Sequence, residues 1–332
     1  MAADLAAATP RPFDAGSLVP WAALVAMLAL PALLTPYTQD LVVRIAVYAI
    51  FALSLQLLVG RTGLVSLGHA AFLGIGAYAT VLVSGDAGAS LARVLPIAIG
   101  AGALYALFVG ALSLRTRGVY FIMVTLAFAQ MAYFIAHDTP LGGGSDGIFL
   151  YVKPTLEIGG AKLLDLDDRR HLYYAVMGAL ALTYALLALI GRSRFGHALA
   201  GIRVNEQRMR AAGFRTYRYK LAAFVIAGAL AAFAGVLLAA KDGAVNPELM
   251  SWHESGAVLL MLILGGIGSL RGAVVGAVAF TLLKELFQSE ALLGPLAAHW
   301  QLTLGLTIIA FVALLPKGLI GIGARMRGRR NA

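Results

Sequence analysis

The 332-residue sequence contains no cysteine and few charged residues. Without cysteine the chain can have no disulfide framework, no thiolate metal ligand and no thiol nucleophile. Charged residues make up 13% of the sequence, against roughly 25% in soluble domains, whereas apolar residues make up 60%. A composition this apolar predicts a protein whose solvent is a lipid bilayer rather than water.

The sequence also lacks the short motifs of several enzyme classes. It contains no HExxH zinc motif and no GxxxxGK[ST] phosphate loop. The acids Asp165, Asp167 and Asp168 lie close together, but they lack the glycine and the distal glutamate of a calcium-binding EF-hand loop, so we interpret them as a solvated face. We therefore expect no catalytic residues, no metal and no cofactor, and any ATP chemistry must belong to another subunit.

Long apolar stretches are what the sequence has in abundance. A helix that crosses the hydrocarbon core needs about 20 residues. Stretches without Asp, Glu, Lys or Arg predict ten membrane segments, with eight or nine as alternatives: 15–39, 45–60, 62–85, 94–114, 118–137, 171–191, 221–240, 255–270, 272–283 and 291–316. The ninth must extend past Lys284 and Glu285 to span, with the lysine reaching toward the membrane surface. The predicted fold class is an all-α polytopic membrane protein with about ten transmembrane helices, some of them short or glycine-interrupted.

The distribution of basic residues predicts the orientation. If the first segment is retained rather than cleaved as a signal peptide, the inward-facing segments hold more than two thirds of the 26 Lys and Arg residues. This positive-inside bias favours cytoplasmic termini in a bacterial inner membrane, and it explains the net charge of +10 without a nucleic-acid partner. The predicted parts are a cytoplasmic tail at 1–17, a membrane domain at 18–320 with an outer segment at 137–171 and an inner loop at 192–220, and a basic cytoplasmic tail at 321–332.

Two glycine-rich segments, 60–80 and 264–277, interrupt the apolar stretches. Transporters break helices at such segments and expose backbone groups to a solute at mid-membrane. The alternative is a helix-packing seam without solute contact, and a structural hydrogen bond is the alternative role for a histidine inside a span. The candidate pathway residues in these segments are Ser66, His69, Phe72, Tyr78, Gly265 and Gly266.

The inner loop at 192–220 combines eight basic residues with one acid, Glu206. Its Ala198, Leu199, Ile202, Glu206, Met209 and Ala212 recur at helical spacing, and Gly213 is typical of a helix stop. We predict a short amphipathic helix on the inner face. Contact with anionic lipid is the general alternative for a basic helix of this kind.

The order of these features resembles the permease subunits of branched-chain amino acid ABC transporters. GLVSLGHAAFLGIGAY, TPLGGGSDGI, the inner loop with its continuation to FAGVLLA, and LGGIGSLRGAVVGA carry the resemblance, which spans nearly the whole sequence. It implies a pore subunit that works by alternating access in the lipid bilayer. It also implies separate ATP-binding subunits, a second homologous permease, a periplasmic substrate-binding protein and a small-molecule solute as partners.

The resemblance further implies that the inner loop is the coupling segment, similar to the EAA loop that docks to the ATPase of other importers. Gly213 matches the glycine of that motif, and Arg203, Asn205 and Glu206 match positions before it. The usual Glu-Ala-Ala positions are Gln207, Arg208 and Met209 here, so this chain departs from the pattern at its centre.

These features do not determine the identity of the solute. Leucine, isoleucine and valine are the first candidates by resemblance, and urea, short amides and other apolar amino acids are the alternatives. An ion-coupled carrier or channel would ordinarily place acids or histidines in its spans, and these spans have almost none. A scaffold without transport would leave the combined motifs unexplained.

Overall fold

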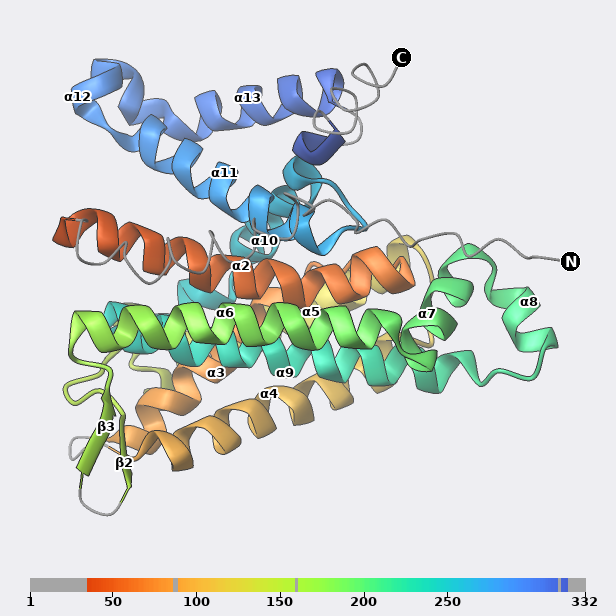
Figure 1. Ribbon diagram of the computed structural model, residues 1–332, viewed down its shortest axis with the longest axis horizontal. Helices are drawn as coiled ribbons and strands as arrows, with labels where there is room; N and C mark the ends of the chain where they lie inside the picture. Colours follow the sequence, from red (N-terminus) through yellow and green to blue (C-terminus); the bar gives the residue numbers. More distant parts are fainter. Residues whose placement is uncertain (1–34, 86–88, 159–160, 316–317, 322–332) are drawn as a thin grey trace, which may run out of the picture.

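The computed structural model of the chain describes residues 35–85, 89–158, 161–315 and 318–321. These residues form a bundle in which most of the helices run side by side (Figure 1). The long helices are α2 (Pro36–Thr62), α4 (Leu91–Ser113), α5 (Val119–Asp138), α6 (Arg169–Arg192) and α9 (Thr216–Asp242). The shorter ones are α3 (His69–Ser84), α7 (Arg194–Val204), α8 (Glu206–Ala211), α10 (Trp252–Gly265), α11 (Leu270–Gln288), α12 (Glu290–Leu293) and α13 (Trp300–Leu314).

Helices α2 and α9 form the centre of the bundle. The most apolar stretch of α2 is 78% buried, whereas that of α6 is only 22% buried. The peripheral helices expose large apolar side chains such as Leu104, Leu182 and Leu306. A surface of this kind suits contact with lipid chains, because the backbone of each helix is already hydrogen-bonded internally.

Within the described residues, six helical stretches are long and apolar enough to cross a membrane: the five long helices and a stretch from Ala297 that contains α13. Helices α10 and α11 pass the same test as a pair bent by 115°, which gives seven spans if the pair counts as one. The predicted class of polytopic helical membrane protein therefore fits, but ten transmembrane helices are not confirmed. The tail predicted at 1–17, most of the first predicted segment, and all but the first residue of the tail predicted at 321–332 lie outside the described residues.

Three predicted boundaries differ in the structure. Helix α2 continues through Asp40 and Arg44, which the sequence interpretation placed between two spans; Asp40 is accommodated because it pairs with Lys241 at 3.1 Å. The third predicted segment is interrupted, since Gly63 takes a left-handed conformation (φ 74°) that ends α2, and α3 begins only at His69. The eighth and ninth predicted segments are the two arms of the bent pair rather than two full spans.

The bend between α10 and α11 follows from glycine. Gly266 and Gly268 have φ of 114° and 102°, values that side-chain-bearing residues rarely adopt. A Cβ on Gly265 would lie 1.9 Å from the carbonyl oxygen of Gly272, and a Cβ on Gly276 would lie 1.8 Å from that of Met261. The two helices therefore pack backbone against backbone, which only glycine permits at these positions.

The outer segment predicted at 137–171 holds two 3₁₀ turns, η1 (Pro140–Gly142) and η2 (Gly144–Asp146), and strands β1 (Ile148–Phe149), β2 (Thr155–Ile158) and β3 (Ala161–Asp165). Strands β2 and β3 form an antiparallel hairpin at the end of the bundle opposite α8 (Figure 1). Strand β1 pairs with β4 (Ala244–Val245), which leads to η3 (Pro247–Met250), and η4 (Gly294–His299) precedes α13. Asp168 caps α6 by accepting a hydrogen bond from the backbone N–H of Arg170.

Candidate functional site

The inner loop forms two short helices, not the single helix that the apolar spacing predicted. Asn205 has an extended backbone (φ −156°, ψ 98°), and its side-chain oxygen accepts a hydrogen bond from the Arg208 N–H at 2.9 Å. Asparagine is a favoured N-cap because its side chain replaces the missing backbone acceptor, so α7 ends at Val204 and α8 begins at Glu206. The predicted stop at Gly213 is confirmed by its left-handed conformation, with φ of 85°.

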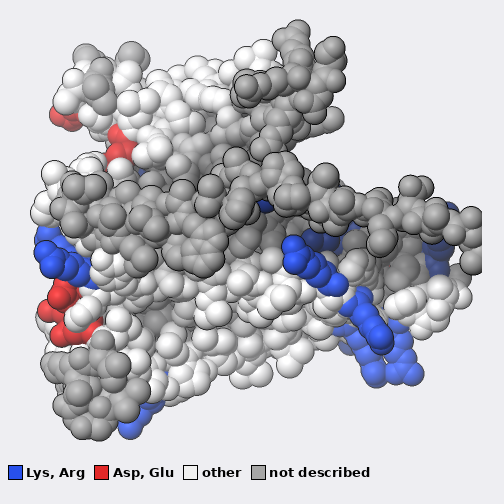
Figure 2. Space-filling model, in the orientation of Figure 1, with Lys and Arg blue, Asp and Glu red and all other residues white. Residues whose placement is uncertain are grey.

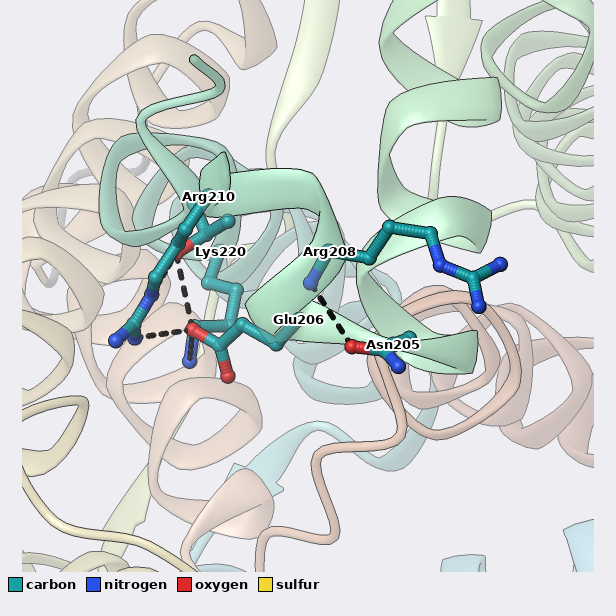
Figure 3. Close-up of polar contacts among 6 residues, drawn as sticks. Asn205, Glu206, Arg208, Arg210 and Lys220 are labelled. Atoms are coloured by element: carbon teal, nitrogen blue, oxygen red, sulfur yellow. Dashed lines mark hydrogen bonds and ion pairs between the residues drawn. The ribbon is translucent and has the colours of Figure 1, made fainter. Parts of the chain in front are cut away.

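Glu206 holds α8 against the start of α9 (Figure 3). Its Oε1 lies 2.6 Å from Arg210 Nη2 and 3.0 Å from Lys220 Nζ, and it accepts the Thr216 hydroxyl at 2.9 Å. Partial burial by itself would raise the pKa of the Glu206 carboxyl. The hydrogen bonds from Lys220, Arg210 and Thr216 outweigh burial and lower this pKa to about 2. Glu206 is therefore ionised at neutral pH and fixes the shape of the loop.

Arg203 connects α7 to the interior of the bundle. Its Nη1 donates a hydrogen bond to the backbone oxygen of Gly60 in the last turn of α2. The same nitrogen lies 3.7 Å from the position of a Cβ on Gly268, in the turn between α10 and α11. With the Gln56 amide oriented so that its oxygen faces this turn, it accepts the N–H groups of Gly268 and Ser269 at 2.6 and 2.9 Å. Helix α7, the end of α2 and the α10–α11 turn are thus in direct contact.

The exposed surface of the inner loop is basic and partly apolar. Arg208, Arg215 and Arg218 are exposed, as are Val204 and Phe214. Figure 2 shows that Lys and Arg gather over the end of the molecule that carries α7 and α8. An open depression of about 430 Å³ lies between Ala212 and Tyr219. This surface can receive a protein partner that supplies acidic and apolar groups.

His69 is one of two candidate pathway residues, with Ser66, that are fully buried. It is the first residue of α3 rather than a mid-helix residue, and its side chain is fully buried. Its Nε2 lies 2.8 Å from Ser54 Oγ, and its ring stacks on Phe51 and meets the edge of Phe72. These contacts favour the structural role of the histidine, which was the alternative to solute contact.

The structure does not bring the remaining candidates to one cavity. Ser66 is buried and accepts the backbone N–H of Gly68 at 3.3 Å. Tyr78 donates a hydrogen bond to the Gly142 carbonyl at 3.3 Å and lines an apolar groove of about 390 Å³. Gly265 and Gly266 form the α10–α11 turn described above. Of the six candidates, only His69 and Phe72 are in aromatic contact.

The sequence interpretation missed a charged cavity at the opposite end of the bundle. The cavity is about 170 Å³ and lies between α2, α9, α10 and α11. Its charged lining residues are Arg44, Asp242, Glu254, Lys284 and Glu285. These residues marked the limits of apolar stretches in the sequence, and nothing in their spacing indicated that four helices would bring them together.

Comparisons with known proteins show which family the chain belongs to. Residues 37–312 match the family described as "Branched-chain amino acid transport system / permease component". The LivM permease protein of the high-affinity branched-chain amino acid transport system of Escherichia coli K12 is 30% identical over 90% of this chain and 73% of its own length. The LivH permease protein of the same strain is 23% identical over 82% of this chain and 91% of its own length.

More distant similarity extends to sugar permeases. The xylose transport system permease protein XylH of E. coli K12 is 36% identical, but over only 34% of this chain and 30% of its own length. No solved structure matches the chain.

Proposed function

Because this chain belongs to the family of branched-chain amino acid transport permease components, we propose that it forms one half of the membrane pathway of an ATP-driven importer for leucine, isoleucine and valine. The observation that carries the choice of solute is the similarity to LivM over 90% of the chain. The match to a xylose permease is confined to a third of the chain, and sugars are therefore the second candidate.

The proposed coupling site is the inner loop with Arg203, Asn205, Glu206 and Gly213. Docking of a separate ATP-binding subunit is supported by the exposed basic and apolar side chains around the depression beside Gly213. Asn205 and Glu206 would act indirectly, since the former caps α8 and the latter holds it to α9. The loop can then move as a unit with the ATPase.

Arg203 provides the route by which that motion would reach the pathway. It contacts the last turn of α2 at Gly60 and lies beside the α10–α11 turn. A shift of α7 would displace the glycine turn at Gly266–Gly268, where backbone torsions change at low cost. We infer that the two arms of the bent pair rock about this turn and open the pathway to each side alternately.

The remaining partners follow from the same proposal. A second, homologous permease would complete the pathway, and a periplasmic binding protein would deliver the solute at the end that carries the β2–β3 hairpin. The subunit would lie in a bacterial inner membrane with the α7–α8 end in the cytoplasm, as the positive-inside bias predicts. The ATPase subunits, rather than this chain, would hydrolyse ATP.

The test is ATP-dependent uptake of radiolabelled leucine into proteoliposomes that contain this chain, the companion permease, the ATPase and the binding protein. We expect saturable uptake that valine and isoleucine block and that xylose and urea do not. Proteoliposomes without the ATPase are the control and should show no accumulation. Uptake of xylose or urea in place of leucine, with normal ATP hydrolysis, would keep the architecture and reject the proposed solute.

A further inference from the structure

We propose that the charged cavity between α2, α9, α10 and α11 is a binding site for a small zwitterion, with Arg44 facing its carboxylate and Glu254 its ammonium group. This inference rests on the proposed function and adds a place where the solute is bound within the subunit. The cavity lies at the end of the bundle opposite α7 and α8, where α2 and α10 begin and where α9 and α11 finish (Figure 1).

The first observation is that charges of both signs line this cavity without forming a close ion pair with one another. Arg44 and Lys284 form no ion pair within 4 Å of a carboxylate among the residues that the structure describes, and neither does Glu254 with a basic group. Glu254 accepts one hydrogen bond, from the Tyr48 hydroxyl at 3.3 Å, and Lys284 lies over the ring of Trp300. Unpaired charges among apolar helices are costly, so water or a charged ligand must balance them.

Other charged residues at the same end of the bundle are closely paired, unlike the three that face the cavity. Lys241 lies 3.1 Å from Asp40 and 2.7 Å from Asp242, and its side chain is 3% exposed. Glu285 accepts a hydrogen bond from the Tyr37 hydroxyl. The same end of the bundle therefore pairs some of its charged and polar groups closely and leaves Arg44, Lys284 and Glu254 facing the cavity.

A second, independent observation is an unsatisfied hydroxyl in the cavity wall. Thr281 is 5% exposed, and its Oγ1 has no hydrogen-bond partner in the described part of the chain. Buried polar atoms are nearly always hydrogen-bonded, so an unpartnered hydroxyl that lines a cavity indicates a missing partner inside it.

The rest of the lining suits an aliphatic amino acid. Leu238, Ala257, Met261 and Phe280 form the apolar part of the wall. The cavity volume of about 170 Å³ is several times the roughly 30 Å³ that one water occupies in the liquid. Guanidinium groups bind carboxylates through two parallel hydrogen bonds, and a carboxylate accepts the N–H groups of an ammonium ion. A sugar has no charge with which to balance either group.

The absence of cysteine provides a direct test. In the complete reconstituted complex, Thr281→Cys is treated with a small water-soluble methanethiosulfonate, and labelling of this subunit is followed with and without leucine. We expect labelling that leucine slows at least about threefold and that xylose at the same concentration does not slow. Thr183→Cys, a buried threonine of α6 away from the cavity, is the matched control and should stay unlabelled.

The charged groups are tested in the same assay. In the Thr281→Cys background, Arg44→Gln should raise the leucine concentration that gives half-maximal protection by about tenfold, the effect of losing roughly 1.4 kcal/mol of binding. Arg93→Gln, the same change at an exposed position of α4, should leave that concentration unchanged. If Thr281→Cys does not assemble, Gln288→Cys at the cavity lining replaces it.

The outcomes separate this site from the proposed function. Absence of labelling, or labelling that leucine does not slow, overturns the site; if the unmodified complex still accumulates leucine, the proposed function stands. Equal slowing by leucine and xylose overturns the choice of a zwitterion. Protection by leucine in a complex that does not accumulate leucine supports the site and rejects the transport proposal.

Discussion

The two ends of the molecule use charge in opposite ways. At the α7–α8 end, basic residues dominate the surface, and the acid Glu206 is paired with Arg210 and Lys220 (Figure 2). At the other end, charges of both signs line a cavity, and Arg44 and Glu254 form no ion pair within the described residues. Paired charges fix a shape, whereas unpaired charges in a cavity are available to a ligand.

Helices α10 and α11 connect these two ends. Their glycine turn lies beside Arg203 and Gln56 at the α7–α8 end, while Glu254 near the start of α10 and Lys284 near the end of α11 line the cavity. A movement of the turn that alters the angle between α10 and α11 would therefore change the distance between Glu254 and Lys284. Variants that break this connection should have larger effects than variants at either end alone.

The largest effect is expected for Gly265→Ala. The new methyl carbon would lie 1.9 Å from the Gly272 carbonyl oxygen, so α10 and α11 must separate. We expect a loss of stability of about 3 kcal/mol or more, and with it loss of uptake. Thermal unfolding in detergent measures the first and leucine uptake the second. Gly256→Ala in the same helix has open space at this position and should unfold like the unmodified protein.

Gly213→Pro should abolish coupling while leaving the far end intact. Proline cannot adopt the φ of 85° found at this position, and it removes the N–H that donates to the Arg210 carbonyl. We expect uptake to fall at least about tenfold, with normal membrane insertion, as the cost of about 1–3 kcal/mol falls on the loop. Gly118→Pro is the control, because Gly118 also has a positive φ that proline cannot adopt but lies in another loop. Near-normal uptake by Gly118→Pro would show that the loss in Gly213→Pro is specific to the inner loop. Normal uptake by Gly213→Pro would reject the docking surface.

A pair of glutamine substitutions sharpens the comparison between the two ends. Glu206→Gln removes the charge that holds Arg210 and Lys220, and we expect the free energy of unfolding to fall by about 1–2 kcal/mol, discounted for a side chain that is 26% exposed. Glu254→Gln removes an unpaired charge, and it should leave stability unchanged or raise it slightly. The measurement is the melting temperature of each variant relative to the unmodified protein. Equal destabilisation by the two substitutions would contradict the assignment of Glu206 as paired and Glu254 as unpaired.

The smallest effect is a pH dependence that belongs to the α7–α8 end. The pKa of Glu206 is lowered from 4.5 to about 2, so its contribution to stability is fully present above about pH 4.5 and is lost as the pH falls toward 2. We expect the melting temperature of the unmodified protein to fall by a few degrees more than that of Glu206→Gln over this range. Parallel curves for the two proteins would show that the ion pairs contribute no stability.

Hydropathy and motif order were sufficient to predict the class of fold and the family resemblance. The helix break at Asn205 also has a signal in the sequence, because asparagine is a favoured N-cap, although apolar residues recur at helical spacing on both sides of it. The continuity of α2 could not be predicted from hydropathy, since Asp40 pairs with Lys241, which is about two hundred residues away in the sequence. The charged cavity depends on the same kind of long-range packing.

The glycine turn also has a consequence for biogenesis. Helix α10 has 14 residues and is about 21 Å long at 1.5 Å per residue, short of a hydrocarbon core of about 30 Å. It cannot therefore be released into lipid as an independent span. Gln56 and Arg203, which meet the turn, precede it in the sequence and are synthesised first, so its contact residues are already present when α10 and α11 emerge from the ribosome. The order of translation would then help to place the α10–α11 turn.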